Sequence, residues 1–517
     1  MVMHRTTRAV YGIALLTVAV HLAVNARYGF FRDELYFIAC ARHLALGYVD
    51  LPPLIPFITW LCAPFGFAVW TLRVLPAVAA GAAILVGCAI ARELGGGRFA
   101  QTLTGVATVL APIYLILGNI LSTTSFEPLF WSLLIYFAIR LVKSEDDRIF
   151  FPIAAIVAVG TYAKYSMLIC AAAIVFGLLV TGHGRILRSR RFALAIAIVA
   201  VVLAPNIAWQ WQHGFPMREV IHDDQVRRYA LQNGVAFESP NVAVNALYFT
   251  LMQLVYCNPL LSVLWIWGLI ALLTRRELAP YRFVGASYVL LVALMIATIG
   301  RGYYLAGFYV ALFAAGAVAV ERAIAGRHRI EQGVVAAGAC LAFIMVPIAL
   351  PIFPVEMLIR YESALGISRP APPDGSRHLI SPLFADEFGW EAMTQLTARV
   401  YRDLPPAQRS QTAVYADGYG YAGALAYYGP RYGLPQPISA NNTFYLWGTR
   451  GYDGRSMIAV GATDYPILLR SFRRVMQVAV YRDAYRWMIE GPLPIYLCTQ
   501  PRAPLAALWP AFKRYGL

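Results

Sequence analysis

Long apolar runs, separated by short basic loops, recur from residue 9 to residue 353 of this chain of 517 residues. A helix of about 20 apolar residues is long enough to cross a bilayer. The runs predict eleven such spans, at 9–26, 67–91, 99–118, 124–142, 149–163, 166–181, 192–211, 247–273, 283–300, 303–320 and 332–353. We therefore expect a polytopic α-helical membrane protein with about 11 transmembrane helices over residues 1–353.

The charges in the loops predict how the chain is oriented. Alternate loops each carry at least two Arg or Lys residues, at 92–98, 140–148, 185–191, 275–282 and 322–329. Because cytoplasmic loops are enriched in these residues, we place these loops and the N-terminus inside and the segment after residue 353 outside. Residues 1–26 also have the features of a cleavable secretory signal. Cleavage would detach the carboxylates after residue 26 from this membrane anchor, so we favour an uncleaved first helix.

The composition agrees with a membrane protein and changes near residue 354. The chain is 59% hydrophobic and 14% charged, whereas soluble proteins carry about 25% charged residues. After a Pro-rich polar linker at 368–377, strand-like runs occur at 412–416, 456–461 and 475–481, with a helical pattern at 420–429. Alternating strands and helices indicate a small α/β domain. We expect this domain at residues 354–517, on the external side.

Charge and cysteine usage exclude two further interpretations. The net charge of +16 follows from basic cytoplasmic loops, so we expect no nucleic-acid partner. The seven cysteines show no CxxC pair and no metal-ligand spacing, which argues against a disulfide framework or a zinc site.

Carboxylates stand at the predicted outer membrane boundary, where charge is costly and often functional. Asp33 and Glu34 follow the first span, and Glu127 lies in the short external turn before the fourth. Two structural explanations compete with function. Asp33 suits an N-cap of a helix starting near Glu34, and Glu127 suits a turn before Pro128. Residues 35–46 also fit a short amphipathic helix at the membrane surface.

Cations and aromatic residues form a second group near the same boundary. Lys164 is one of three lysines in the chain, and an ammonium at this depth needs an anion or a path to the headgroups. Arg301 adjoins Tyr303 and Tyr304, which suits either an aromatic belt or phosphate recognition. His222 lies in the stretch HDDQVRR, which reads as a solvated helix or as a contact to a sugar or a metal.

Together these residues predict a cavity on the external side, covered by the long segments 27–66 and 212–246. Carboxylates beside cations at a bilayer surface suit a substrate with a lipid tail, a phosphate and a sugar. One carboxylate would act as general base on an acceptor hydroxyl, and the cations would stabilise the departing phosphate.

The chain resembles the GT-C membrane glycosyltransferases, in the branch similar to protein O-mannosyltransferases and the lipid A aminoarabinose transferase. The resemblance rests on RDELYFIACARHLALGYVDLPPL (32–54), SFEPLFW (125–131), KYS (164–166), PNIAWQWQHGFP (205–216) and RGYYLAGFYVALFAAGAVAVE (301–321). Residues 417–429 and 433–448 are similar to the external domains of bacterial members.

The resemblance implies a GT-C fold and transfer of a sugar, with inversion, from a polyprenyl-phosphate donor to a hydroxyl on the outer face. Membrane lipids and a glycolipid, envelope glycan or protein acceptor are the expected partners, in the inner (plasma) membrane of a bacterium. The resemblance makes Asp33 the general base, with Glu34 in support and Glu127 as the second acidic residue, although many relatives have Asp there. The expected substrate-binding residues are Lys164, Arg301, Tyr303, Tyr304, Tyr48, Asp50 and His222.

Several alternatives stay open at this stage. The sugar, the acceptor and a requirement for a divalent metal do not follow from the sequence, and we assign no cofactor. A lipid-linked-sugar flippase is the main competing function. Transporters often show internal repeats, and none is evident here. A non-catalytic assembly factor whose tail binds a partner is a further alternative.

Overall fold

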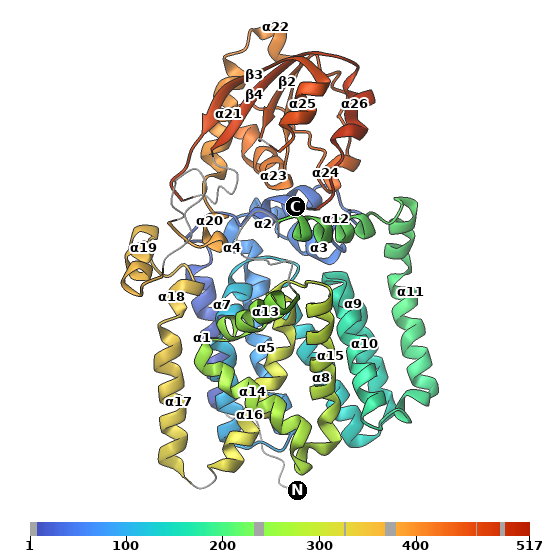
Figure 1. The fold of residues 1–517 in the computed structure, drawn as a ribbon, viewed down its shortest axis with the longest axis vertical. Coiled ribbons are helices and arrows are strands. Elements are labelled where there is room, and N and C mark those ends of the chain that lie inside the picture. Colours follow the sequence, from blue (N-terminus) through green and yellow to red (C-terminus); the bar gives the residue numbers. More distant parts are fainter. Residues whose placement is uncertain are drawn as a thin grey trace.

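Helices make up most of the chain up to residue 343 and form one bundle (Figure 1). The computed structural model describes residues 8–231, 242–324, 327–367, 379–461, 463–485 and 492–516. The bundle contains α1 (Arg8–Val24), α5 (Val74–Glu93), α6 (Arg98–Leu110), α7 (Pro112–Asn119), α8 (Glu127–Ser144), α9 (Phe150–Ala163), α10 (Ser166–Val180), α11 (Arg190–Gln212), α13 (Val242–Tyr256), α14 (Pro259–Thr274), α15 (Arg282–Ala297), α16 (Ala306–Ala323) and α17 (His328–Phe343). The predicted helical membrane protein is confirmed.

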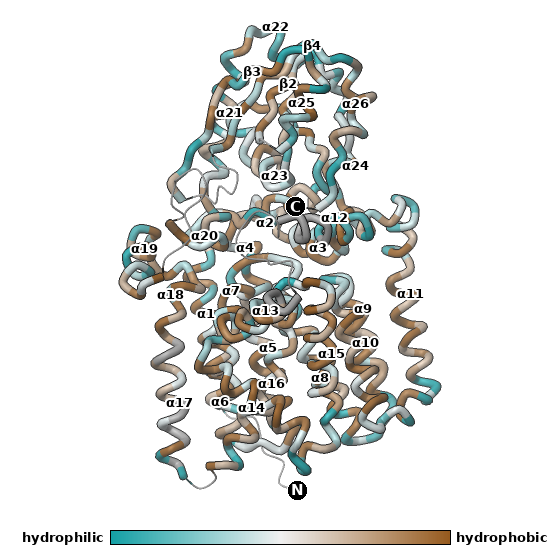
Figure 2. The backbone as a smooth tube through the Cα atoms, in the orientation of Figure 1, coloured by the Kyte–Doolittle hydropathy of each residue, from teal (hydrophilic) through white to brown (hydrophobic). Residues whose placement is uncertain are grey.

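Several of these helices are long and apolar enough to cross a membrane. Four helical segments of the described chain qualify individually: Val69–Glu93, Arg190–Gln212, Arg276–Ala297 and Gly302–Ala323. Two bent helix pairs raise the number to six. Every predicted span contains a helix, whereas the number of crossings and the orientation stay predictions. Hydrophobic residues dominate the bundle helices and become sparser at their ends (Figure 2).

Two segments that the hydrophobic pattern predicts as continuous spans are bent in the structure. The segment at 247–273 divides into α13 and α14 at an angle of 108°. Asn258 lies between them with a φ of 67°, and its side chain accepts a hydrogen bond from Leu260 N–H. The segment at 99–118 bends by 63° before Pro112. A proline disfavours helical geometry at the residue before it, which explains both breaks.

The C-terminal part carries a four-stranded sheet above the bundle (Figure 1). Its strands are β1 (Thr412–Ala416), β2 (Ser456–Val460), β3 (Phe472–Tyr481) and β4 (Leu493–Pro501), in the order β1-β2-β4-β3. β1 and β2 are parallel, and the other pairs are antiparallel. Helices α21 (Trp390–Arg402), α23 (Tyr419–Tyr428) and α26 (Leu505–Phe512) accompany the sheet. We call the described residues from 379 to 516 the C-terminal unit.

The sequence predicted part of this unit. Three strands and α23 overlap the predicted patterns, whereas β4 and helices such as α21 and α26 were missed. The predicted linker at 368–377 lies outside the described residues, and the domain division at residue 353 stays a prediction.

A layer of short helices separates the bundle from the sheet (Figure 1). It includes α2 (Arg32–Ala41), α3 (Leu54–Trp60) and α12 (Pro216–Leu231). The expected amphipathic surface helix at 35–46 is wrong, because α2 starts earlier and is buried from Glu34 to Ala41. It packs against α23, where a Cβ atom at Gly423 would lie 2.7 Å from the Leu35 carbonyl carbon.

We expect Gly423→Ala to lower the stability of the protein by roughly 1–3 kcal/mol, because overpacked contacts against backbone relax poorly. Thermal unfolding in detergent would measure this change. Gly12→Ala is the matched control, since a Cβ atom at Gly12 meets nothing within 4 Å in helix α1. Equal melting temperatures for the two variants would contradict close packing of α2 on α23.

Candidate active site

Asp33 lies in the first turn of α2, at the boundary between the bundle and the C-terminal unit. The N-cap of this helix is Phe31, so the N-cap explanation of Asp33 is wrong. The cap is completed by Glu34, whose Oε2 accepts a hydrogen bond of 2.8 Å from Phe31 N–H. Asp33 keeps 31% of its side chain exposed, and its Oδ1 accepts a hydrogen bond of 2.7 Å from the Tyr419 hydroxyl. The carboxylate therefore remains accessible on one side.

Glu34 has a different environment from its neighbour. Its side chain is fully buried, and each of its two oxygens accepts a hydrogen bond of 2.8 Å from the Arg73 guanidinium. Oε1 also accepts Leu121 N–H at 2.9 Å. With both oxygens engaged and no exposure, Glu34 has no access to a substrate. Glu34 instead anchors α2 to Arg73 and to the chain at Leu121. The prediction that Glu34 belongs to the catalytic group is therefore corrected.

Arg73 was not found from the sequence, although it is a charged residue inside the predicted span at 67–91, where charge is costly and often functional. It is completely buried and also bonds Glu387 at 3.1 Å. Two further donors reach the carbonyl oxygens of Asn25 and Gly29, at 2.7 and 2.9 Å. One guanidinium thus joins the end of α1, the start of α2 and the C-terminal unit.

Glu127 and Lys164 form the second charged group of the site. Glu127 is the first residue of α8, and Lys164 lies between α9 and α10. Lys164 Nζ is 3.0 Å from Glu127 Oε2 and 2.8 Å from Thr124 Oγ1, while the Ser166 hydroxyl donates to Glu127 Oε1. The lysine is held by an anion beneath the surface, which favours the ion-pair interpretation over snorkelling.

Aromatic rings and a second cation adjoin this ion pair. Lys164 Nζ lies 4.7 Å from the ring centre of Tyr304 and 5.7 Å from that of Tyr303, within the range of cation–π attraction. Arg301 pairs with Asp224 of α12 at 3.0 Å. The charges of Asp33, Glu127 and Arg301 all act on the Tyr303 hydroxyl. Tyr303 is therefore within electrostatic reach of both carboxylates and of Arg301, and its ring is in contact with Lys164.

The other predicted substrate-binding residues divide into two kinds. Asp50 is near Asp33 and accepts hydrogen bonds from the Tyr36 hydroxyl at 2.6 Å and from Asn442 Nδ2 at 2.8 Å. Burial raises the pKa of Asp50 to about 7. Tyr48 is buried, and its hydroxyl bonds backbone groups of the turn after α2. A substrate contact by the Tyr48 side chain is therefore wrong.

His222 stands apart from this group. Its side chain is exposed on α12, which fits the solvated-helix interpretation. Within the described chain, no three His, Cys, Asp or Glu side chains are grouped so that they could hold a metal ion.

An apolar groove of about 320 Å³ opens beside Lys164. It lies between α9, α10, α11 and the start of α12, and is lined by Thr161, Tyr165, Leu168, Leu203, Asn206, Ile207, Gln210, Phe215, Met217 and Ile221. Asn206 holds one wall in place, because it bonds the Tyr165 hydroxyl at 2.9 Å and the Leu46 carbonyl at 2.8 Å. The groove thus adjoins Tyr165, the residue next to Lys164 of the charged group.

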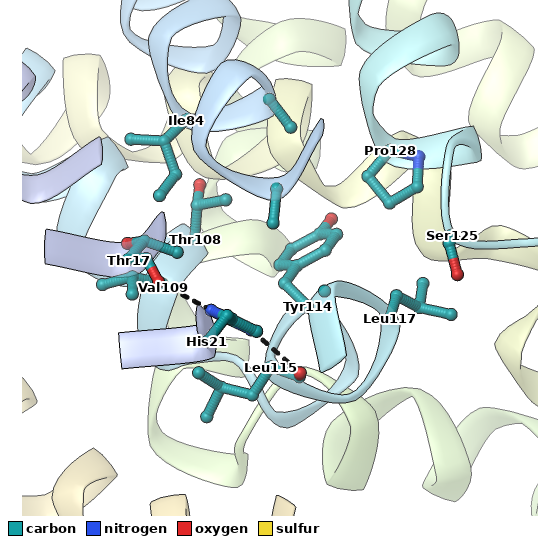
Figure 3. A pocket seen from close by; sticks show the side chains of 13 residues that line it. Thr17, His21, Ile84, Thr108, Val109, Tyr114, Leu115, Leu117, Ser125 and Pro128 are labelled. Atoms are coloured by element: carbon teal, nitrogen blue, oxygen red, sulfur yellow. Dashed lines mark hydrogen bonds between the residues drawn. The ribbon is translucent and has the colours of Figure 1, made fainter. Parts of the chain in front are cut away.

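A second, much smaller cavity of about 10 Å³ lies inside the bundle (Figure 3). His21 points into it, with Nδ1 2.8 Å from the Thr17 carbonyl and Nε2 3.1 Å from the Leu115 carbonyl. A Cβ atom at Gly118 would lie 2.6 Å from His21 Nε2. This imidazole packs α1 against α7 and takes no part in the site around Asp33.

Comparison with known proteins agrees with this architecture. Residues 50–209 match the family model described as dolichyl-phosphate-mannose-protein mannosyltransferase. The structure is similar to that of ArnT from Cupriavidus metallidurans in the apo state, with a TM-score of 0.57 and 17% identity over 94% of this chain and 98% of that one. The fold is that of the GT-C membrane glycosyltransferases. The predicted resemblance is confirmed.

Two further structures are similar to that of this chain. ArnT from the same organism bound to undecaprenyl phosphate has a TM-score of 0.58 and 16% identity, over 94% of this chain and 97% of that one. An oligosaccharyltransferase from Archaeoglobus fulgidus has a TM-score of 0.47 and 11% identity, over 89% and 68% of the two chains. No curated protein sequence matches the chain significantly.

The Arg73 cluster predicts a dependence of stability on pH. Burial raises the pKa of Glu387 to about 7 from an ordinary value of 4.5. A carboxyl with a raised pKa in the folded state stabilises the fold while protonated, fully below the unfolded value, and this contribution is lost as pH rises through the folded value. We expect the melting temperature to fall between about pH 5 and about pH 8. Glu387→Gln would flatten part of this slope, and Asp50 accounts for another part. An unchanged slope in Glu387→Gln would contradict this assignment.

Proposed function

We propose that the chain is a glycosyltransferase that moves a sugar from a polyprenyl-phosphate donor to a hydroxyl acceptor on the outer face of a bacterial plasma membrane. The observation that carries the proposal is the grouping around Tyr303. An accessible carboxylate, Asp33, and two cations, Lys164 and Arg301, come from segments far apart in sequence, and all three act on Tyr303. An apolar groove begins at Tyr165, the residue after Lys164. The family match and the ArnT structure with undecaprenyl phosphate support the donor class.

The cations have donors left for a phosphate. A lysine ammonium carries three N–H donors and an arginine guanidinium five. Among the described residues, Lys164 uses two of its donors, on Thr124 and Glu127, and Arg301 makes one hydrogen bond to Asp224. A phosphate between them would accept charge-assisted hydrogen bonds while the carboxylates keep the empty site close to neutral. The isoprenoid chain would then follow the groove.

The reaction follows from this placement. Asp33 takes the proton of the acceptor hydroxyl. At the same time the acceptor oxygen attacks the anomeric carbon of the sugar from the face opposite the phosphate. The bond from that carbon to the phosphate oxygen breaks, and polyprenyl phosphate leaves with the bonding electrons. Attack from the opposite face inverts the anomeric configuration. Lys164 and Arg301 stabilise the charge that grows on the leaving phosphate.

A lipid-linked-sugar flippase is the alternative that one observation favours. Two helix pairs are broken, at 111–112 and 257–258, and transporters often use broken helices at their binding sites. The charged group, however, lies at the outer end of the bundle helices, under the C-terminal unit. Translocation of intact undecaprenyl-phosphate sugars across liposomes, without sugar release or transfer from any donor in a panel, would overturn the enzyme assignment.

Replacing the base tests the assignment of Asp33. We expect Asp33→Asn to lower turnover by roughly 10²- to 10⁴-fold, the usual contribution of a positioned general base. Sugar transfer from undecaprenyl-phosphate hexoses and pentoses would be measured with the purified protein. Asp453→Asn, which removes a carboxylate that pairs with Arg455 on the surface of the C-terminal unit, is the control. Full activity of Asp33→Asn would remove Asp33 as the base.

Replacing a cation tests the phosphate site. We expect Lys164→Met to raise the KM for the donor at least about tenfold, because a charge-assisted hydrogen bond to phosphate is lost. Lys143→Met is the matched control, because Lys143 also pairs with a glutamate, Glu93 at 2.8 Å, between other helix ends. The same KM change in both variants, or in neither, would contradict a phosphate contact by Lys164.

A further inference from the structure

Asp33 is in contact with a tyrosine that lies 386 residues later in the chain. The Tyr419 hydroxyl donates to Asp33 Oδ1 at 2.7 Å, and its ring packs 5.0 Å from that of Tyr36, centre to centre. The Arg32 guanidinium lies 5.6 Å above the same ring. Tyr419 N–H donates to Asn441 Oδ1 at 2.8 Å. Ring, hydroxyl and backbone are all held, so the phenol has a defined orientation towards Asp33.

Glycines at the start of α23 allow this helix to lie close to α2. Residues 418–423 have the sequence Gly-Tyr-Gly-Tyr-Ala-Gly and form the N-cap and first turn of α23, two residues after strand β1. This is the pattern and context of a dinucleotide-binding loop. Here α2 fills the space that the glycines leave. A Cβ atom at Gly420 would lie 2.5 Å from Arg32 Cγ, and one at Gly423 would lie 2.7 Å from the Leu35 carbonyl carbon. The glycines thus bring α23 against the helix that carries Asp33.

A second connection holds the loop that follows α2. The Tyr36 hydroxyl is 2.6 Å from Asp50 Oδ1 and 2.7 Å from Thr443 Oγ1. Asn442 Nδ2 donates to Asp50 Oδ2 at 2.8 Å. Both α2 and the Asp50 loop are therefore hydrogen-bonded to the C-terminal unit.

We propose that Tyr419 is a positioning residue for Asp33, and that the catalytic group is complete only when the C-terminal unit is docked on α2. A carboxylate has two oxygens. Tyr419 occupies Oδ1 as a donor and fixes the plane of the carboxylate, so that Oδ2 is the atom that receives the proton of the acceptor hydroxyl. This inference rests on the proposed function, since it takes Asp33 as the base.

Tyr419→Phe tests the inference, because it keeps the ring and removes the hydroxyl. We expect kcat to fall roughly 10- to 100-fold, as for the loss of a hydrogen bond to a charged group, with the donor KM unchanged and the melting temperature lowered no further than in the control variant. Undecaprenyl-phosphate hexoses and pentoses serve as donors with the full-length protein. Tyr432→Phe is the matched control. It removes a tyrosine–carboxylate hydrogen bond of 2.5 Å to Glu391 within the C-terminal unit, and we expect it to keep wild-type kcat.

The double variant separates this inference from the function it rests on. If Tyr419 acts through Asp33, Tyr419→Phe will not lower the residual rate of Asp33→Asn any further. A wild-type kcat in Tyr419→Phe, together with an inactive Asp33→Asn, overturns the role of Tyr419 and leaves the base assignment intact. The same fold loss in both backgrounds also overturns it. Full activity of Asp33→Asn overturns the base assignment and this inference together.

Discussion

The guanidinium of Arg73 is fully buried, and its five N–H groups donate to oxygens of four residues. Two bonds reach Glu34, one reaches Glu387, and two reach the carbonyls of Asn25 and Gly29. Removing one partner of a buried ion pair typically costs about 3–5 kcal/mol, because the remaining charge is left uncompensated. The arrangement of α1, α2 and the C-terminal unit therefore depends on this one side chain.

The position of Asp33 follows from that arrangement. Glu34 is anchored by Arg73, so the neighbouring side chain, one residue earlier in the same helical turn, is directed to another side of α2 towards Tyr419. The cost of placing further charges at the membrane boundary is reduced by pairing, Lys164 with Glu127 and Arg301 with Asp224. Because each cation is paired with a carboxylate, the site can contain two cations that are able to bind an anionic group without a large net positive charge.

Local patterns in the sequence predicted much of this structure, and contacts distant in sequence account for what was missed. Apolar runs identified helices throughout the bundle, but a run that continues across Asn258 and Pro259 conceals the bend between α13 and α14. The Asp33–Glu34 pair was recognised as special, yet its two members could not be told apart. Their partners, Arg73 and Tyr419, lie 39 or more residues away, and no periodicity links them. Lys164 was found because a charge in an apolar setting is visible in sequence alone, and Asp50 because it lies in the stretch 32–54 that carries the family resemblance.

The most direct test of the account is a cryo-electron microscopy structure of the full-length protein with undecaprenyl phosphate. The account predicts phosphate density within about 3 Å of Lys164 Nζ or the Arg301 guanidinium, with the isoprenoid chain in the groove between α10 and α11 and the Asp33 carboxylate facing the phosphate across the cavity. Phosphate density remote from both cations, with Lys164 still bound only to Glu127 and Thr124, would contradict it.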